Sequence, residues 1–342
     1  MTARAFITGM AGTTISEDEA GFFRDARPWG LILFKRNIDN PAQVKAITQH
    51  FREILGWNAP VLIDQEGGRV QRMGPPHWPV YPAGAAYAAL YRSDRASGLE
   101  AARLGGRLLA EDLFAVGIDV DCVPVADVPV PGADRVIGDR AFGDTPEQVA
   151  ALAGAQAEGL MTAGVLPVVK HLPGHGRATA DSHLKLPVVE TDRATLEKTD
   201  FAAFRPLSRL PLGMTAHVVF SAIDAVQPAT TSAIMIRDVI RGSIGFEGLL
   251  MSDDVSMGAL SGSLSGRSHA ALAAGCDLVL HCNGNLDEMQ AVAAAAPVLE
   301  GDAAARADRA LALRSNRTAI DLAAARARFA DLMKQPAAGA IA

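Results

Sequence analysis

Short runs of apolar residues recur along the whole chain, separated by stretches with the 3.6-residue periodicity of an amphipathic helix or by irregular loops. Apolar runs that alternate with helices are typical of a parallel sheet whose strands are buried on both faces. The predicted strands are residues 5–10, 30–34, 61–64, 118–123, 166–171, 212–217, 248–252 and 277–281.

The segments between these strands predict helices. They include residues 41–54, which have a proline in their opening turn, and residues 98–115, 145–161 and 232–240. Helical stretches rich in alanine and arginine follow the last strand, from about residue 286 to 333, and residues 336–342 are expected to form a frayed tail. Eight strands with helical crossovers predict the α/β class and a single-domain (β/α)8 TIM barrel over residues 1–335.

An open, doubly wound sheet is the competing fold. It normally has a G-x-G-x-x-G fingerprint between its first strand and first helix. Residues 9–14 occupy that place and read GMAGTT, which lacks the spacing. The barrel is therefore preferred.

Composition narrows the range of partners. The 342 residues are 49% hydrophobic, with 32 basic and 38 acidic side chains and a net charge of −6, so we expect no nucleic acid partner. The chain opens without the pattern of a secretory signal, and no apolar run reaches the roughly 18 residues that span a bilayer. Cys122, Cys276 and Cys282 lie in apolar segments and are expected to be reduced. We expect a cytoplasmic monomer that does not bind membranes.

Polar residues gather where the predicted strands end, which is the catalytic face of such a barrel. The third strand leads into DQEGGRVQR (64–72), the fifth into KHLPGHG (170–176), the sixth ends in TAH (215–217), and the seventh ends in SDD (252–254). The fourth leads on to GDRAF (138–142). Any one of these groups could be a structural ion pair, but their position at one end of the barrel indicates a functional site.

Three of these segments together resemble glycoside hydrolase family 3. They are KHLPGHG at 170–176, DSH at 181–183 and SDDVSM at 252–257, in that order along the chain. More narrowly, they resemble the single-domain bacterial β-N-acetylhexosaminidases of this family, over about residues 5–285. Leu172 stands where the family commonly has Phe, and Val255 where it often has Leu. Neither side chain has a reactive or polar group.

The resemblance implies that Asp253 is the nucleophile, which forms a glycosyl-enzyme that water hydrolyses with retention. A carboxylate suits this step because the transition state resembles an oxocarbenium ion. Asp254 is the rival. The family motif favours the first aspartate, and neighbouring side chains in a strand point in opposite directions, so we expect Asp254 to accept structural hydrogen bonds.

The resemblance assigns general acid and base catalysis to His183, oriented by Asp181, although most glycosidases use a second carboxyl group. The Asp-x-His spacing lets the carboxylate accept from one ring nitrogen while the other faces the glycosidic oxygen. An ordinary imidazole titrates near pH 6.5 and can therefore donate and recover a proton near neutrality. Gly174 and Gly176 predict a mobile loop that carries this pair, and His175 is expected to pack within it.

The family pattern also points to a set of residues that binds a terminal N-acetylglucosamine, in which a carboxylate accepts from sugar hydroxyls and cations donate to oxygens. The set is Asp64, Arg72, Arg140, Lys170 and His171. Arg69 and Glu66 are expected to support it. His217 either lines the pocket or supports it structurally.

The leading hypothesis is a retaining exo-β-N-acetylglucosaminidase that needs no cofactor or metal. The resemblance further implies that it removes N-acetylglucosamine from 1,6-anhydro-N-acetylmuramic acid, with or without its peptide, during peptidoglycan recycling. A β-N-acetylglucosaminide phosphorylase with the same residues is the alternative, because a histidine does not repel phosphate as a carboxylate does. Phosphate-dependent release would identify it.

Three other hypotheses remain open to test. A β-glucosidase of the same family usually takes its acid/base carboxyl from an additional domain, for which this chain has no room. A metal-dependent hydrolase would use His171, His175 and His183, but no H-x-H or H-E-x-x-H spacing is present, and chelation would test it. A sugar-binding barrel without catalysis would be favoured by the loss of Asp253 or His183, and both are present.

Overall fold

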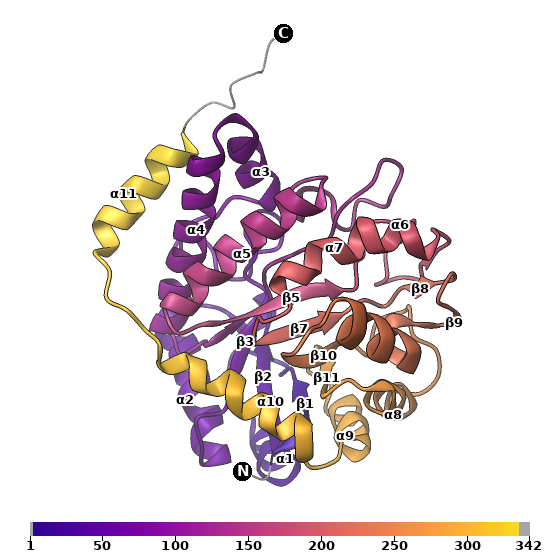
Figure 1. The fold of residues 1–342 in the computed structure, drawn as a ribbon. Helices are drawn as coiled ribbons and strands as arrows, with labels where there is room; N and C mark the ends of the chain where they lie inside the picture. The colour runs from indigo at the N-terminus through magenta and orange to yellow at the C-terminus, as the bar shows by residue number, and fades with distance from the viewer. Residues whose placement is uncertain (1–2, 335–342) are drawn as a thin grey trace.

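The computed structural model describes residues 3–334, so the predicted tail at 336–342 lies outside the described residues. Parallel strands close into a barrel in the order β1-β11-β10-β7-β5-β4-β3-β2 (Figure 1). They are β1 (Arg4–Thr8), β2 (Pro28–Leu33), β3 (Val61–Ile63), β4 (Val120–Asp121), β5 (Leu166–Leu172), β7 (Leu212–Thr215), β10 (Leu249–Asp254) and β11 (Leu278–His281). Each predicted strand is present, so the predicted (β/α)8 barrel is confirmed.

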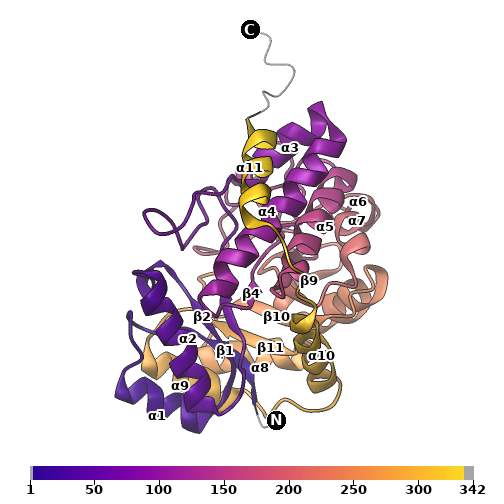
Figure 2. The same ribbon diagram turned by 90° about the vertical axis from the view of Figure 1, so that its left-hand side faces the viewer.

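Helices surround the barrel on its outer face (Figures 1 and 2). They are α1 (Glu17–Ala26), α2 (Pro41–Leu55), α3 (Gly84–Ser93), α4 (Arg95–Ala115), α5 (Pro146–Thr162), α6 (Arg193–Lys198), α7 (Asp200–Phe204), α8 (Leu264–Ala274), α9 (Leu286–Ala295), α10 (Gly301–Ala312) and α11 (Leu322–Met333). Between residues 3 and 334, no helix is both long and apolar enough to cross a membrane.

Local sequence signals explain where several helices begin. The Asn40 side chain caps α2 by accepting from the backbone N–H of Gln43, and Thr145 caps α5 in the same way ahead of Pro146. Asp94 caps α4, so this helix begins before the predicted residue 98. The helix predicted at 232–240 is a π-helical segment at Met235–Ser243.

A small second sheet was not predicted. It consists of β6 (Val188–Val189), β8 (Val219–Phe220) and β9 (Asp224–Pro228), in the order β6-β8-β9. Two of its strands have only two residues, which is too short for any periodic pattern. The sheet joins the loop that follows β5 to the loop that follows β7, and so fixes the far end of the segment that carries Asp181 and His183.

Alternation along the strands determines which side chains face the inside of the barrel. The interior is filled by a layered apolar cluster that includes Ile7, Ile32, Leu62, Val120, Cys122, Leu166, Val168, Leu212, Met214, Leu249, Met251, Leu278 and Leu280. The next inward position after Leu62 is Asp64, and the corresponding positions on β5 and β10 are Lys170 and Asp253. The same alternation that builds the core therefore places these three charged side chains at its open end.

At the opposite end of the barrel, a buried carboxylate attaches the helix α10. Asp277 accepts from the backbone N–H of Leu250 and from Arg241 and Arg306, each at 2.8 Å. Arg306 belongs to α10, so this cluster holds that helix against the base of the barrel. Further along the chain, α11 packs on α4 and α3 (Figure 2).

We expect Asp277→Ala to lower the free energy of unfolding by about 3 kcal/mol or more, because two arginines and a backbone N–H lose their partner away from bulk water. The matched control is Glu247→Ala, which removes a pair with Arg209 that is 62% and 84% exposed. This control should cost less than about 1 kcal/mol. Urea unfolding measures both, and equal small losses would contradict the role given to Asp277.

Candidate active site

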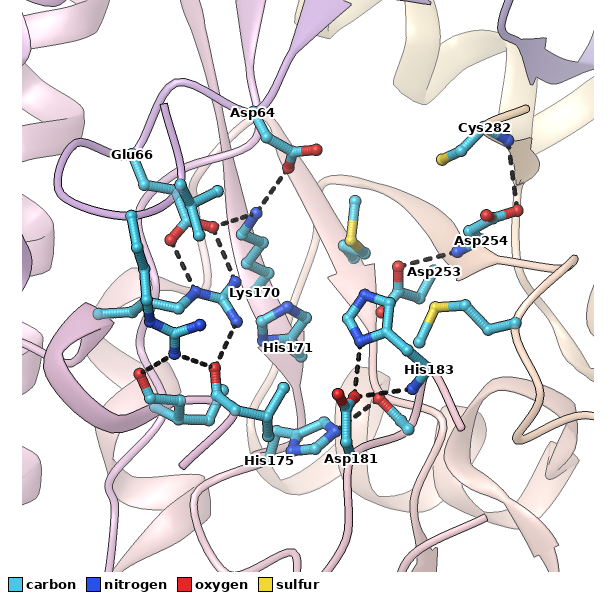
Figure 3. Close-up of a pocket in the computed structure, with 18 of the residues that line it drawn as sticks. Asp64, Glu66, Lys170, His171, His175, Asp181, His183, Asp253, Asp254 and Cys282 are labelled. Carbon is cyan, nitrogen blue, oxygen red and sulfur yellow. Dashed lines mark hydrogen bonds and ion pairs between the residues drawn. The ribbon is translucent and has the colours of Figure 1, made fainter. Parts of the chain in front are cut away.

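A cavity of about 530 Å³ opens at the carboxyl ends of the barrel strands (Figure 3). Asp64, Lys170 and Asp253 line it, together with apolar atoms of Phe34, Met214 and Leu280. The loops that follow β3, β4 and β5 supply Arg72, Arg140 and the segment with Asp181 and His183. All eight residues that the sequence proposed for the site therefore border the same cavity, namely Asp64, Arg72, Arg140, Lys170, His171, Asp181, His183 and Asp253.

Lys170 is the centre of a buried charge cluster. Only 3% of its side chain is exposed, and its Nζ lies 2.8 Å from Asp64 Oδ1 and 2.7 Å from Glu66 Oε1. Glu66 in turn receives two hydrogen bonds from Arg140, of 2.7 and 2.8 Å. Arg72 approaches the other oxygen of Asp64 at 3.4 Å. Two of the three ammonium protons of Lys170 are thereby engaged, which leaves one donor for a ligand.

Electrostatics keep this cluster ionised. Burial alone would raise the pKa of both carboxyl groups, but the positive charge of Lys170 outweighs it, helped by Arg140 at Glu66 and by Arg72 at Asp64, so both pKa values are lowered. Burial alone would lower the pKa of Lys170, but Asp64 and Glu66 raise it well above its ordinary value. The site therefore presents fixed charges over the physiological pH range.

His171 is oriented by a buried carboxylate that sequence reasoning missed. Its Nδ1 lies 2.6 Å from Asp127 Oδ2, and Asp127 is fully buried in the loop that follows β4. Burial would raise the pKa of Asp127, but His171 and the hydrogen bonds outweigh it and lower the value. In the sequence, Asp127 is a single aspartate within the apolar run 123–130, which no motif marks. With Nδ1 held, Nε2 of His171 is the nitrogen left for the cavity.

Asp253 and Asp254 differ in their surroundings. Asp253 accepts from the backbone N–H of Asp254, and its pKa is lowered, because His217 and His171 outweigh the effect of burial. The carboxylate of Asp254 accepts from the backbone and hydroxyl of Ser256 and from the backbone N–H of Cys282. Asp254 is thus occupied by loop hydrogen bonds, whereas Asp253 has an oxygen open to the cavity.

The Asp181 and His183 pair lies on the loop that follows β5. His183 Nδ1 is 2.6 Å from Asp181 Oδ1, and the same oxygen accepts from the backbone N–H of His183. The His183 side chain is 63% exposed, and its Nε2 has no protein partner in the part of the chain that the structure describes. Figure 3 shows its ring facing the same cavity as Asp253.

His217 and Arg69 hold other parts of the site in position through hydrogen bonds. Both ring nitrogens of His217 are engaged, with Thr230 Oγ1 at 2.7 Å and the carbonyl oxygen of Asp254 at 2.9 Å. Arg69 donates to Asp139 and to the carbonyl oxygens of residues 135–137, which fixes the loop that carries Arg140.

The histidines considered for a metal site do not form a ligand set. His171 and His183 both direct Nδ1 at a carboxylate, and the buried ring of His175 contacts Ser182. Across residues 3–334, no group of three or more His, Cys, Asp or Glu side chains could hold a metal ion.

The lowered pKa of Glu66 predicts how stability depends on pH. A carboxyl group whose pKa is lowered by folding stabilises the fold at pH values above its ordinary pKa of 4.5. This contribution is lost as the pH falls towards the pKa of the folded state. Glu66→Gln should therefore be less stable than the wild type at about pH 6, and the gap should narrow by about pH 3.5. Urea unfolding at both pH values measures the gap, with exposed Glu247→Gln as control. A gap that stays constant or widens on acidification would contradict the prediction.

Comparison with known proteins agrees with this architecture. The family model described as "Glycosyl hydrolase family 3 N terminal domain" matches residues 8–312. A β-hexosaminidase from Alkalilimnicola ehrlichii is 43% identical over 279 residues, which are 80% of this chain and 79% of that protein.

Solved structures extend the similarity to the whole barrel. NagZ from Neisseria gonorrhoeae, in complex with N-trifluoroacetyl-D-glucosamine, has a TM-score of 0.86 at 32% identity, covering 97% of this chain and 99% of that chain. A β-N-acetylhexosaminidase from Beutenbergia cavernae has a TM-score of 0.74 at 28% identity, covering 96% of each. The prediction of a β-N-acetylhexosaminidase is thus confirmed, and the chain belongs to glycosyl hydrolase family 3.

Proposed function

We propose that this enzyme is a retaining exo-β-N-acetylglucosaminidase. It removes β-1,4-linked N-acetylglucosamine from 1,6-anhydro-N-acetylmuramic acid and its peptide derivatives, in the peptidoglycan recycling of the cytoplasm. The observation that carries the proposal is one cavity lined by a carboxylate with an open oxygen, Asp253, by an imidazole with an open nitrogen, His183, and by a fixed charge cluster around Lys170. The relatives named β-hexosaminidase support the choice of sugar.

In the first step, a carboxylate oxygen of Asp253 attacks the anomeric carbon. The bond to the glycosidic oxygen breaks, and His183 Nε2 gives that oxygen its proton. Asp181 holds the opposite ring nitrogen and stabilises the imidazolium when it forms. The products of this step are the free aglycone and a glycosyl ester on Asp253.

In the second step, His183 takes a proton from a water molecule as its oxygen attacks the anomeric carbon. The ester bond breaks and the electron pair returns to Asp253, which restores the enzyme. Each displacement inverts the anomeric carbon, so the net result is retention. The lowered pKa of Asp253 suits both steps, because the group must be ionised as nucleophile and is a good leaving group.

The charge cluster is placed to bind the terminal sugar. Asp64 can accept from hydroxyl groups, and Lys170, Arg140, Arg72 and His171 can donate to hydroxyl and acetamido oxygens. Because Glu66 and Asp127 fix three of these side chains, little conformational entropy remains to be lost on binding. A volume of about 530 Å³ accommodates one sugar and part of the next.

We expect Asp253→Ala to lower kcat/KM on a chromogenic β-N-acetylglucosaminide by roughly a thousandfold or more at pH 7, because the nucleophile is removed. Asp302→Ala is the matched control, since this side chain is 93% exposed on α10. Assays with and without phosphate complete the test. Release that requires phosphate and yields the sugar 1-phosphate would identify a phosphorylase instead, and undiminished turnover by Asp253→Ala would refute the assigned nucleophile.

A further inference from the structure

Ser182 is buried within the otherwise accessible stretch of residues 181–185. It lies between Asp181 and His183, whose side chains are 34% and 63% exposed, while Ser182 itself is 2% exposed. The next two residues, Leu184 and Lys185, are also exposed. The side chain of Ser182 therefore anchors the short stretch that carries the acid/base pair.

His175 is the group that receives this anchor. Its Nε2 lies 2.9 Å from Ser182 Oγ, and its ring is buried. Within residues 178–187, this is the only hydrogen bond in which a side chain of the segment reaches a residue outside it. The remaining links are backbone bonds, which include those from Gly258 to the His183 carbonyl and from Ala259 to the Ser182 carbonyl.

His175 is in turn fixed by the carboxylate that orients His171. Asp127 Oδ1 accepts from the backbone N–H of His175 at 2.7 Å, while Asp127 Oδ2 lies 2.6 Å from His171 Nδ1. The two imidazole rings pack edge to face with centroids 5.7 Å apart. Burial and the neighbouring His171 lower the pKa of His175 to about 4, so its ring stays neutral near pH 7.

We propose that His175 is a positioning residue that holds the general acid in place through its hydrogen bond to Ser182. One buried carboxylate, Asp127, then sets both the sugar-facing His171 and, through His175 and Ser182, the Asp181 and His183 pair. The substrate contact and the proton donor thereby depend on the same buried carboxylate in the loop after β4. This inference rests on the proposed function, in which His183 protonates the leaving group.

The segment after β10 also makes close backbone contacts with this loop. A Cβ on Gly258 would lie 2.9 Å from the His183 carbonyl oxygen and 2.8 Å from that of Leu184, so the loop already sits as close to the segment after β10 as backbone allows. These contacts and the backbone bonds from Gly258 and Ala259 hold the main chain of the loop. The bond from His175 to Ser182 adds a side-chain link to the stretch that carries His183, so its loss should let the His183 ring shift relative to the glycosidic oxygen.

The test compares leaving groups, because a good leaving group departs without a proton whereas a poor one needs the general acid. The variants are Ser182→Ala and His175→Phe, and the substrates are the 2,4-dinitrophenyl and 4-methylumbelliferyl β-N-acetylglucosaminides. We expect kcat/KM on the methylumbelliferyl substrate to fall by roughly tenfold to a hundredfold, and kcat/KM on the dinitrophenyl substrate by less than about threefold. The double variant should be no worse than the more affected single variant, because both changes remove one bond.

His183→Ala provides the benchmark, since it should show the same dependence on the leaving group with a larger loss. Ser221→Ala is the matched control, because that hydroxyl bonds only the backbone of the small sheet. Thermal unfolding near the wild-type midpoint shows that each variant is folded. An equal loss on both substrates would overturn the positioning role while leaving the proposed function intact. A wild type that cleaves neither substrate would overturn both.

Discussion

The buried ammonium of Lys170 is the constraint on which the rest of this site depends. An unpaired charge in that position would cost several kcal/mol, so the fold has to supply carboxylates at the end of the barrel. Asp64 supplies one and Glu66 the other, and Glu66 then requires Arg140. A chain of ion pairs thus runs from β5 through the loop after β3 to the loop after β4, and it fixes three separate segments in one arrangement.

The alternation of side chains along the barrel strands places the nucleophile. Because alternate residues of each strand face inward, the side chain that follows the last apolar layer necessarily enters the mouth, as Asp253 does on β10 and Lys170 on β5. The acid/base pair cannot be placed in this way, since it lies on a loop beyond β5. It depends instead on the hydrogen bond between Ser182 and His175, and on backbone N–H groups after β10 that donate to the carbonyls of Ser182 and His183. The nucleophile is therefore held by the sheet, and the proton donor by contacts that a single side chain can weaken.

The sequence was sufficient for the barrel because each strand is buried on both faces and therefore reads as a short apolar run. It was also sufficient to bring the proposed site residues together, since each lies in a motif at a strand end or on the loop that follows one. It did not reveal Asp127, because an aspartate in an apolar run has no local signal and its partners, His171 and His175, are 44 and 48 residues away. The central place of Glu66 was likewise hidden, since its bond to Arg140 spans 74 residues. The two-residue strands β6 and β8 depend on tertiary contacts alone.

In the proposed mechanism, Asp253 becomes covalently bonded to the sugar. The most direct test incubates the protein with 5-fluoro-N-acetylglucosaminyl fluoride, whose ring fluorine slows release of the glycosyl-enzyme more than its formation. Mass spectrometry of the intact protein and of its proteolytic peptides then locates the adduct. We expect one added sugar on the peptide that contains Asp253, with fragment ions that assign it to this residue rather than to Asp254, and no adduct on Asp253→Ala. An adduct on another residue, or turnover of the reagent with no adduct at any stage, would contradict this mechanism.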